Sequence, residues 1–194
     1  QLQPADWRQL QSAILDYDRF ATSQIRQPHD TLRLLGQDNI RRYLPMTHVR
    51  IRLAASDSWL DIIARAVAVI AAGARATLSH PPGVQTEIVD LLEALTQVWA
   101  GDLEFLDESD EDLAAAIAAS QVDRLRYSCP AAVPLAIRRA ADAAFVYVAD
   151  APVCPLGRVE LLWYVREQSL SVDYHRYGNL GNRATDPLPT HPIL

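Results

Sequence analysis

Two cysteines and five histidines are the side chains of this sequence best suited to act as nucleophiles, bases or metal ligands. Cys129 and Cys154 form no Cys-x-x-Cys pair, and neither has a histidine or lysine close in sequence that would activate the thiol. The histidines show no i, i+4 pairing or other metal-ligand spacing: they are His29, His48, His80, His175 and His191. We therefore expect two inert thiols and no metal site.

The basic residues exclude further classes of chemistry. All 18 are arginine, because the sequence contains no lysine, so a Schiff-base lysine, a phosphate-loop lysine and a lysine general base are impossible. The net charge is −6, the pI is about 5.3 and the arginines are scattered along the chain. Because neutralising phosphates requires a basic face, nucleic acid is not an expected partner.

The glycines and one loop bear on nucleotide binding. None of the seven glycines belongs to a Gly-x-Gly-x-x-Gly loop between a strand and a helix. The loop after the first predicted strand instead contains Asp57, whose carboxylate would face an incoming pyrophosphate. Asp107 has two interpretations: a ribose-binding acid or, as we favour, part of an acidic approach to a helix. The sequence thus predicts no NAD, NADP or FAD bound to this chain.

The central part of the sequence alternates between strand and helix patterns. Helices are expected at residues 59–72, 85–99, 110–119 and 133–143, the first capped by Ser56 and Asp57 and ended by Gly73. Strands are expected before, between and after them, at residues 48–53, 75–79, 103–106, 124–127 and 145–148. This order predicts an α/β fold with a Rossmann-like parallel sheet of about five strands and helices on both faces.

The two ends of the chain depart from this alternation. An amphipathic helix from Pro4 to about Ile25 and an extended or irregular connector at 32–45 predict an N-terminal arm over residues 1–45. Residues 46–150 form the predicted nucleotide-binding-like domain. Residues 151–194 are expected to contain a short helix at 157–164, a strand at 168–174, turn residues at 177–182 and a tail from 185 without a fold of its own.

The setting of the protein is predicted from what the sequence lacks. The first 26 residues are amphipathic and acidic, unlike a signal peptide, and the apolar run 60–74 contains Asp61 and Arg65 and is too short to span a bilayer. Two isolated cysteines suit a reduced, cytoplasmic protein. Because the chain begins at Gln1, we interpret it as a piece excised from a longer enzyme.

Residues 174–181 are unusual for the end of a domain. Two tyrosines, a histidine, an arginine and two glycines occur within eight residues, a mixture typical of contact surfaces. The strand that precedes them would have unpaired edges and would need a partner outside its own sheet. The alternative interpretation is the polar end of a β-hairpin.

Two strings of the sequence carry a resemblance to a known family. Residues 34–39 with 42–45, and residues 166–181, resemble the C-terminal region of bacterial bifunctional proline-utilisation flavoenzymes (PutA). Those enzymes join a proline dehydrogenase to an L-glutamate γ-semialdehyde (1-pyrroline-5-carboxylate) dehydrogenase, and use FAD and NAD. Many end in an extra domain similar to a degenerate aldehyde-dehydrogenase nucleotide-binding fold.

The resemblance implies a role without catalysis. In that family a Ser-x-Ser-Val motif continues into a Gly- and Asn-containing tail over the aldehyde dehydrogenase site and the substrate passage. The catalytic and flavin-binding residues lie in other domains, so no catalytic, cofactor-binding or metal residue is expected here. The matching lid residues are Ser169, Ser171, Asp173, Tyr174, His175, Arg176, Tyr177, Gly178, Asn179 and Gly181.

Two functions remain open from the sequence. The first is a lid and assembly domain of a proline-catabolic enzyme. Its partner would be the aldehyde dehydrogenase domain of the parent chain or of a second subunit, and a homo-oligomer is possible. The second is an autonomous nucleotide-binding or dehydrogenase-like domain, which rests only on the α/β alternation.

Overall fold

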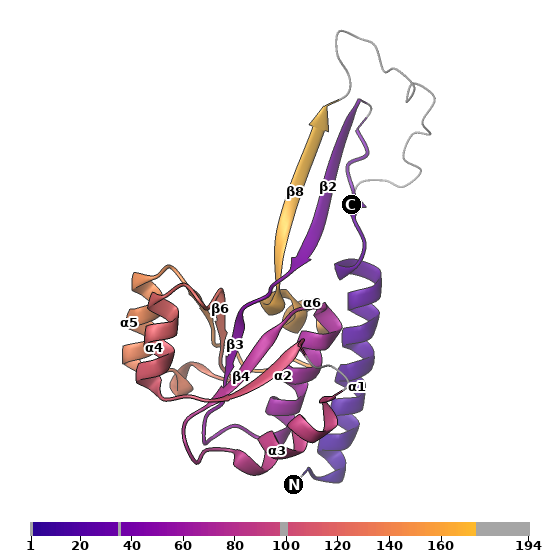
Figure 1. Ribbon diagram of the computed structural model, residues 1–194. Helices are drawn as coiled ribbons and strands as arrows, with labels where there is room; N and C mark the ends of the chain where they lie inside the picture. The colour runs from indigo at the N-terminus through magenta and orange to yellow at the C-terminus, as the bar shows by residue number, and fades with distance from the viewer. Residues whose placement is uncertain (1, 35, 98–100, 174–194) are drawn as a thin grey trace.

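The computed structural model describes residues 2–34, 36–97 and 101–173, and contains one parallel and one antiparallel sheet (Figure 1). All strand pairs of the parallel sheet run in the same direction, which confirms the predicted fold class. The sheet has five strands, in the order β5 (Leu103–Asp107), β4 (Ala76–His80), β3 (Val49–Arg52), β6 (Arg124–Arg126) and β7 (Tyr147–Ala149).

The central strand β3 explains why both faces of the sheet are covered. Strand β3 lies between β4 and β6. Its residues Val49 and Ile51 alternate with Arg50 and Arg52, and all four are buried. Val49 and Ile51 belong to the same buried cluster as residues of α2 (Trp59–Ala72). The two arginines therefore point to the opposite face, where polar partners must satisfy them.

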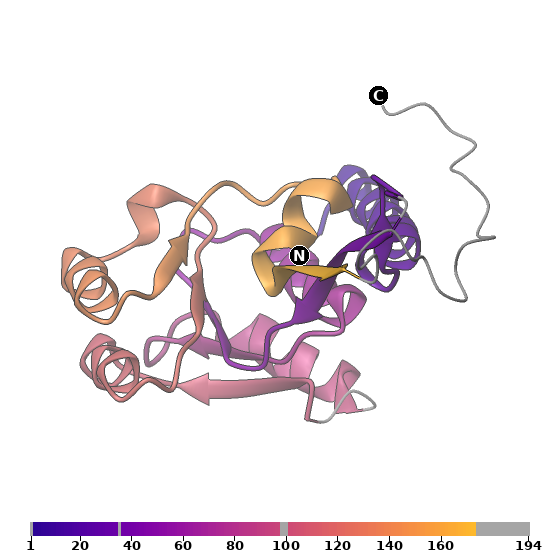
Figure 2. The same ribbon diagram turned by 90° about the horizontal axis from the view of Figure 1, so that it is seen from above.

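Helices pack on both faces, as predicted (Figure 2). One buried cluster joins α1 (Pro4–Phe20) and α2 to β3 and β4. A second cluster joins β6 to α4 (Asp110–Ala118) and α5 (Leu135–Ala143). The remaining long helix, α3 (Thr86–Leu95), connects β4 to β5. Among the described residues, no helix is both long and apolar enough to cross a membrane.

The ends of α2 and α3 correct two details of the prediction. Ser58, and not Ser56 or Asp57, caps α2, because its hydroxyl accepts a hydrogen bond from the Asp61 amide at 3.1 Å. Gly73 ends the helix in the left-handed conformation with φ +69°, as expected. The helix predicted at 85–99 ends at Leu95. The last two residues of the predicted range, 98 and 99, lie outside the described residues.

The N-terminal helix is part of the packed body. Leu10, Ala13 and Tyr17 of α1 are buried, and α1 continues into a π-helix, η1 (Ala21–Ile25). The predicted short helix at 157–164 is present as α6 (Gly157–Glu160) and η4 (Leu161–Tyr164), and Gly157 packs directly on α1. The domain boundaries at 45 and 150 stay a prediction, but the first helix packs against the rest of the chain.

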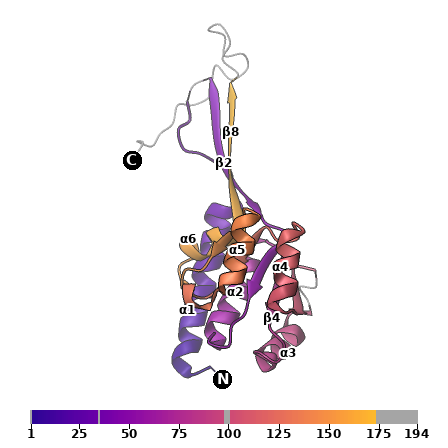
Figure 3. The same ribbon diagram turned by 90° about the vertical axis from the view of Figure 1, so that its left-hand side faces the viewer.

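The antiparallel sheet projects from this body as a ribbon (Figures 1 and 3). Strands β2 (Gln37–Pro45) and β8 (Val165–Asp173) pair along their whole length, from Gln37 opposite Asp173 to Pro45 opposite Val165. Strand β1 (His29–Asp30) adds two residues to the other edge of β2. We call β2 and β8 the arm. The connector predicted at 32–45 is therefore largely a regular strand.

Candidate functional site

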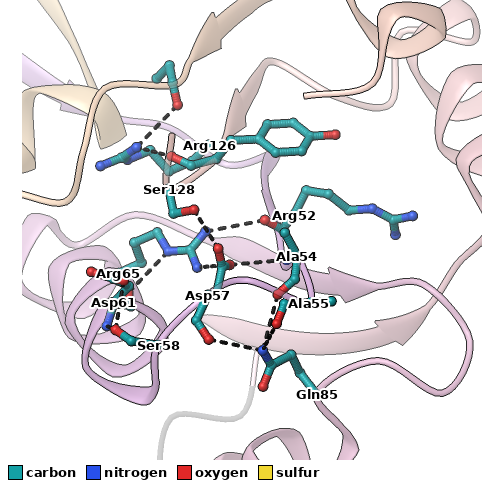
Figure 4. Close-up of polar contacts among 12 residues, drawn as sticks. Arg52, Ala54, Ala55, Asp57, Ser58, Asp61, Arg65, Gln85, Arg126 and Ser128 are labelled. Carbon is teal, nitrogen blue, oxygen red and sulfur yellow. Dashed lines mark hydrogen bonds and ion pairs between the residues drawn. The ribbon is translucent and has the colours of Figure 1, made fainter. Parts of the chain in front are cut away.

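The order of the parallel sheet defines where a ligand crevice would lie. Strands β3 and β6 are neighbours, and the chain winds outward from them in opposite directions. Ligands of such sheets bind outside the carboxyl ends of the strands at this switch point. Here those ends lead into the loop 53–58 after β3 and the loop 127–129 after β6. Both loops contribute to a dense polar network (Figure 4).

Asp57 is the centre of that network. Its carboxylate forms an ion pair with Arg65 of α2, and both side chains are fully buried. It also accepts hydrogen bonds from the Ala54 amide at 3.1 Å and from the Ser128 hydroxyl. A backbone amide that an incoming phosphate would need is thus already bonded to a carboxylate of the chain itself.

Gln85 holds the same loop from the neighbouring strand connection. Its side-chain amide donates to the carbonyls of Ala54 and Asp57 at 3.1 and 3.0 Å. Gln85 has φ +59°, a left-handed conformation that is uncommon outside glycine and places it directly before α3. The loop is therefore fixed both by Asp57 and by a side chain that reaches it from another element.

The acidic run after β5 serves the start of α4. Arg52 donates to the Asp110 carboxylate at 2.6 Å and to the Glu108 carbonyl at 2.8 Å. Ser109 caps α4, and the Asp112 carboxylate in turn accepts a hydrogen bond from the Ser109 amide. Asp107 ends β5 with an exposed side chain. This arrangement supports the interpretation of the run as a helix approach.

A second buried ion pair lies behind the switch point. Arg126 of β6 donates to both oxygens of Glu160 at 3.0 and 2.9 Å, and both side chains are fully buried. The Tyr164 hydroxyl and the Cys154 amide also donate to Glu160, each at 3.0 Å. Because Glu160 and Tyr164 belong to α6 and η4, this pair joins the last helix to the sheet.

Three tyrosines near these ion pairs stay protonated far above neutral pH. Burial raises the pKa of Tyr164 well above its usual value, and the negative charge of Glu160 raises it further. Burial and Glu160 likewise raise the pKa of Tyr17, whose hydroxyl donates to the Cys154 carbonyl at 2.6 Å. Burial raises the pKa of Tyr127, against the opposing effect of Arg52.

Cys129 directly follows Ser128 in the loop after β6, whereas Cys154 lies in the segment before α6. Cys129 and Cys154 are free thiols of intermediate exposure. Within residues 2–34, 36–97 and 101–173, no three histidine, cysteine or acidic side chains are grouped to hold a metal ion. The predicted absence of a cofactor site stays a prediction.

The arm contains the predicted lid residues that can be located. Ser169, Ser171 and Asp173 lie on β8 opposite Arg41, Asn39 and Gln37. The Ser171 hydroxyl donates to the Asn39 side chain at 2.9 Å and accepts from Gln37 at 3.2 Å. The other seven predicted residues lie outside the described residues: they are Tyr174, His175, Arg176, Tyr177, Gly178, Asn179 and Gly181.

The partner of β8 corrects one expectation. We expected that the sheet of this chain would leave β8 unpaired. Instead, β2 pairs with β8 through nine residue positions. The reason is that residues 37–45 form a long strand that the sequence pattern did not reveal. Among the described strands, the outer edge of β8 has no neighbour.

Sequence reasoning missed most residues of the switch-point network. Arg65, Gln85, Ser128, Arg126 and Glu160 were not candidates, although all of them bond across elements. One signal was available: an arginine on the apolar face of a predicted helix, as at Arg65, requires a buried acidic partner. The sequence did not identify that partner as Asp57.

Known proteins share this fold. Neither models of protein families nor curated protein sequences gave a match to the chain. Among solved structures, Proline Utilization A (PutA) from Corynebacterium freiburgense superposes with a TM-score of 0.56 at 20% identity, over 92% of this chain and 15% of that one. PutA from Bradyrhizobium japonicum, in a mutant form, gives a TM-score of 0.54 at 17% identity, over 74% and 15%.

Aldehyde dehydrogenases show the same likeness. A mutant aldehyde dehydrogenase from Bacillus cereus gives a TM-score of 0.53 at 14% identity, over 72% of this chain and 33% of that one. At these identities the likeness concerns the fold alone. The chain spans a small part of each of these proteins, and its fold resembles a portion of the aldehyde dehydrogenases and of PutA.

Proposed function

We propose that this chain is a non-catalytic domain of a proline-catabolic enzyme, in which the arm covers an aldehyde dehydrogenase site and the substrate passage. The parent would oxidise proline to glutamate through 1-pyrroline-5-carboxylate, using FAD and NAD in other domains. The partner is the aldehyde dehydrogenase domain of the same chain or of a second subunit. The observation that carries this proposal is the arm that projects from a Rossmann-like body.

The switch point supports a role without a cofactor. Asp57 already accepts from the Ala54 amide, Arg65 and Ser128, and Gln85 occupies the carbonyls of the same loop. A dinucleotide would have to displace a buried carboxylate from a buried arginine, which is strongly unfavourable. The hydrogen-bond donors of the crevice that could bind a phosphate thus already bond to a side chain of the same chain.

The two faces of the arm differ in polarity. Ile40 lies opposite Leu170, and both side chains point to the same face. Val172 and Leu44 belong to this face too, and Leu44, Leu170 and Val172 are exposed at 39%, 40% and 44%. The opposite face contains the bonded polar residues Gln37, Asn39 and Ser171. The first face therefore combines these apolar side chains with Asp38, Arg42, Arg166 and Gln168, while the tip of the second face is polar.

A ribbon of this kind is incomplete by itself. Strand β1 covers only two positions of β2, and the rest of the arm is a two-stranded antiparallel pair. Such a pair is at best marginally stable in water and needs a further strand or an apolar surface to cover it. The outer edge of β8 has no neighbour among the described strands. A partner surface could supply both the missing strand contacts and the cover for Leu170 and Val172.

Coupled turnover in the parent enzyme tests the lid. Deletion of residues 169–194 should slow the conversion of proline to glutamate at least several-fold, while proline oxidation by the flavin domain changes little. The point variant Leu170→Asp, which places a charge opposite Ile40, should have the same selective effect. Leu170→Met keeps an apolar side chain at the same position and serves as the control. An unchanged coupled rate in the deletion would show that the arm is only a structural end.

Calorimetric titration of the isolated chain separates the two functions left open by the sequence. With NAD and FAD in the micromolar to millimolar range, we expect no saturable heat, because the loop amide and Arg65 are occupied. Saturable binding at micromolar concentration would instead identify an autonomous nucleotide-binding domain.

A further inference from the structure

The groups around Asp57 have the composition of an oxyanion site. The Ala54 amide, the Arg65 guanidinium and the Ser128 hydroxyl all donate to the two oxygens of one carboxylate. We call these three donors the cradle. A backbone amide, an arginine and a hydroxyl are donors that proteins commonly use for carboxylates and phosphates.

The cradle is held in place by bonds that do not involve the Asp57 carboxylate. Arg65 also donates to the carbonyls of Asp61 at 3.1 Å and of Arg52 at 3.2 Å. Gln85 fixes the loop through its bonds to the carbonyls of Ala54 and Asp57. Removing the carboxylate therefore leaves two of the donors positioned and without their acceptor.

We propose that the cradle is an oxyanion-binding site whose anion is built into the chain as the Asp57 side chain, so that a small free carboxylate binds there once that side chain is removed. The switch point then rejects dinucleotides because its anion position is occupied, and not because its donors have been lost. This inference rests on the contacts of Asp57, and it does not require that the arm covers an aldehyde dehydrogenase site.

Chemical rescue of an Asp57→Ala variant tests the inference in the full 194-residue chain. The substitution leaves the buried Arg65 unpaired, and we expect the thermal unfolding midpoint to fall by roughly 10 °C in sodium chloride. The probe is sodium formate, which has the size of the missing carboxylate. At 0.5 M, formate should raise the midpoint of this variant by roughly 4 °C more than the same concentration of chloride does.

Two controls separate binding in the cradle from general effects of salt. The wild-type midpoint should differ between formate and chloride by less than about 1 °C, because Asp57 occupies the cradle. Asp57→Asn also leaves Arg65 without a charged partner, but its amide fills the space, so formate should give it no more than the wild-type response. In Asp57→Ala with Ser128→Ala, the formate response should shrink because one donor is lost.

The results that would overturn the inference are specific. One is a formate response of Asp57→Ala no greater than that of wild type, and another is an equal response of Asp57→Asn. If Asp57→Ala is unfolded in chloride, recovery of the wild-type circular dichroism spectrum in formate supports the inference, and failure to recover it contradicts the inference. None of these results bears on whether the arm covers an aldehyde dehydrogenase.

Discussion

The switch point and the arm differ in how far the chain satisfies its own polar and apolar groups. At the switch point, two fully buried ion pairs and a backbone amide find all their partners inside the domain. On the arm, apolar side chains such as Leu170 and Val172 are about two-fifths exposed, and an edge of β8 has no neighbour among the described strands. The comparison teaches that the donors of the crevice are bonded within the domain, while the arm leaves apolar side chains and the edge of a described strand uncovered.

The largest expected effect comes from breaking a buried ion pair in the body. Glu160→Gln leaves the Arg126 charge buried without a counter-charge, and we expect the free energy of unfolding to fall by about 3 kcal/mol or more. Urea denaturation followed by circular dichroism measures this loss. Glu167→Gln makes the same chemical change on the exposed arm and should cost less than about 0.5 kcal/mol. Equal losses would remove the distinction between the two regions.

Alkaline pH should weaken the body selectively. Burial raises the pKa of Tyr17, Tyr127 and Tyr164 in the folded chain, so these phenols lose protons above pH 10 in the unfolded chain first. Their contribution is complete below pH 10 and is lost as the pH rises toward their folded values. Three such groups would lower the free energy of unfolding by up to about 4 kcal/mol per pH unit above pH 10.

Denaturant titrations at pH 9, 10 and 11 check this dependence. The variant Tyr164→Phe should show a shallower decrease above pH 10, because it removes one of the three titrating groups. A pH profile that stays flat between 9 and 11 would contradict the burial of these side chains.

A smaller loss is expected where α6 packs on α1. A Cβ at Gly157 would lie 2.8 Å from the Phe20 Cβ and 2.9 Å from the Asp16 carbonyl, so Gly157→Ala forces the two helices apart. We expect a loss of about 1 to 3 kcal/mol in unfolding free energy, measured by urea denaturation. Gly83→Ala is an instructive counterpart, because its Cβ would meet nothing within 4 Å and only its φ of +75° opposes the change.

The smallest effect on global stability should come from the arm itself. Leu170→Pro removes a donor from the ladder with β2 opposite Ile40, yet the body keeps its own core, and we expect less than about 1 kcal/mol of change in unfolding free energy. Hydrogen exchange gives the sharper result. Amides of β8 should exchange faster than those of β3 in wild type, and faster still in the variant. Equal protection of β3 and β8 would show that the arm is as stable as the body.

The sequence predicted the parallel sheet well because its signals are local. Each strand of the body is followed by a helical segment, side-chain caps begin α2 and α4, and the predicted α2 matches the observed bounds, Trp59–Ala72. Strand β2 was missed because it alternates weakly: its residues are mostly polar or charged, and it is buried on neither face. Its pairing with β8 depends on a partner more than a hundred positions away, which no local pattern reveals.

The candidate site could be predicted only in part, for a similar reason. Asp57 stood out because a carboxylate occupies a phosphate-binding position, and the structure adds that Arg65 and Ser128 bind it. Ser128 lies 71 positions from Asp57, so their contact follows from the neighbouring positions of β3 and β6 and not from sequence spacing. Buried charge pairs of this kind become predictable only when the strand order is known.

The pairing of β2 with β8 has a consequence for how the chain is made. Asn39 and Ser171 share a hydrogen bond although they stand 132 positions apart, so the whole parallel sheet is inserted between the two strands of one ribbon. During synthesis β2 leaves the ribosome long before β8 exists, and contacts of such high order close slowly. The arm therefore assembles late, and until β8 has been made the edge of β2 that faces it has no partner strand.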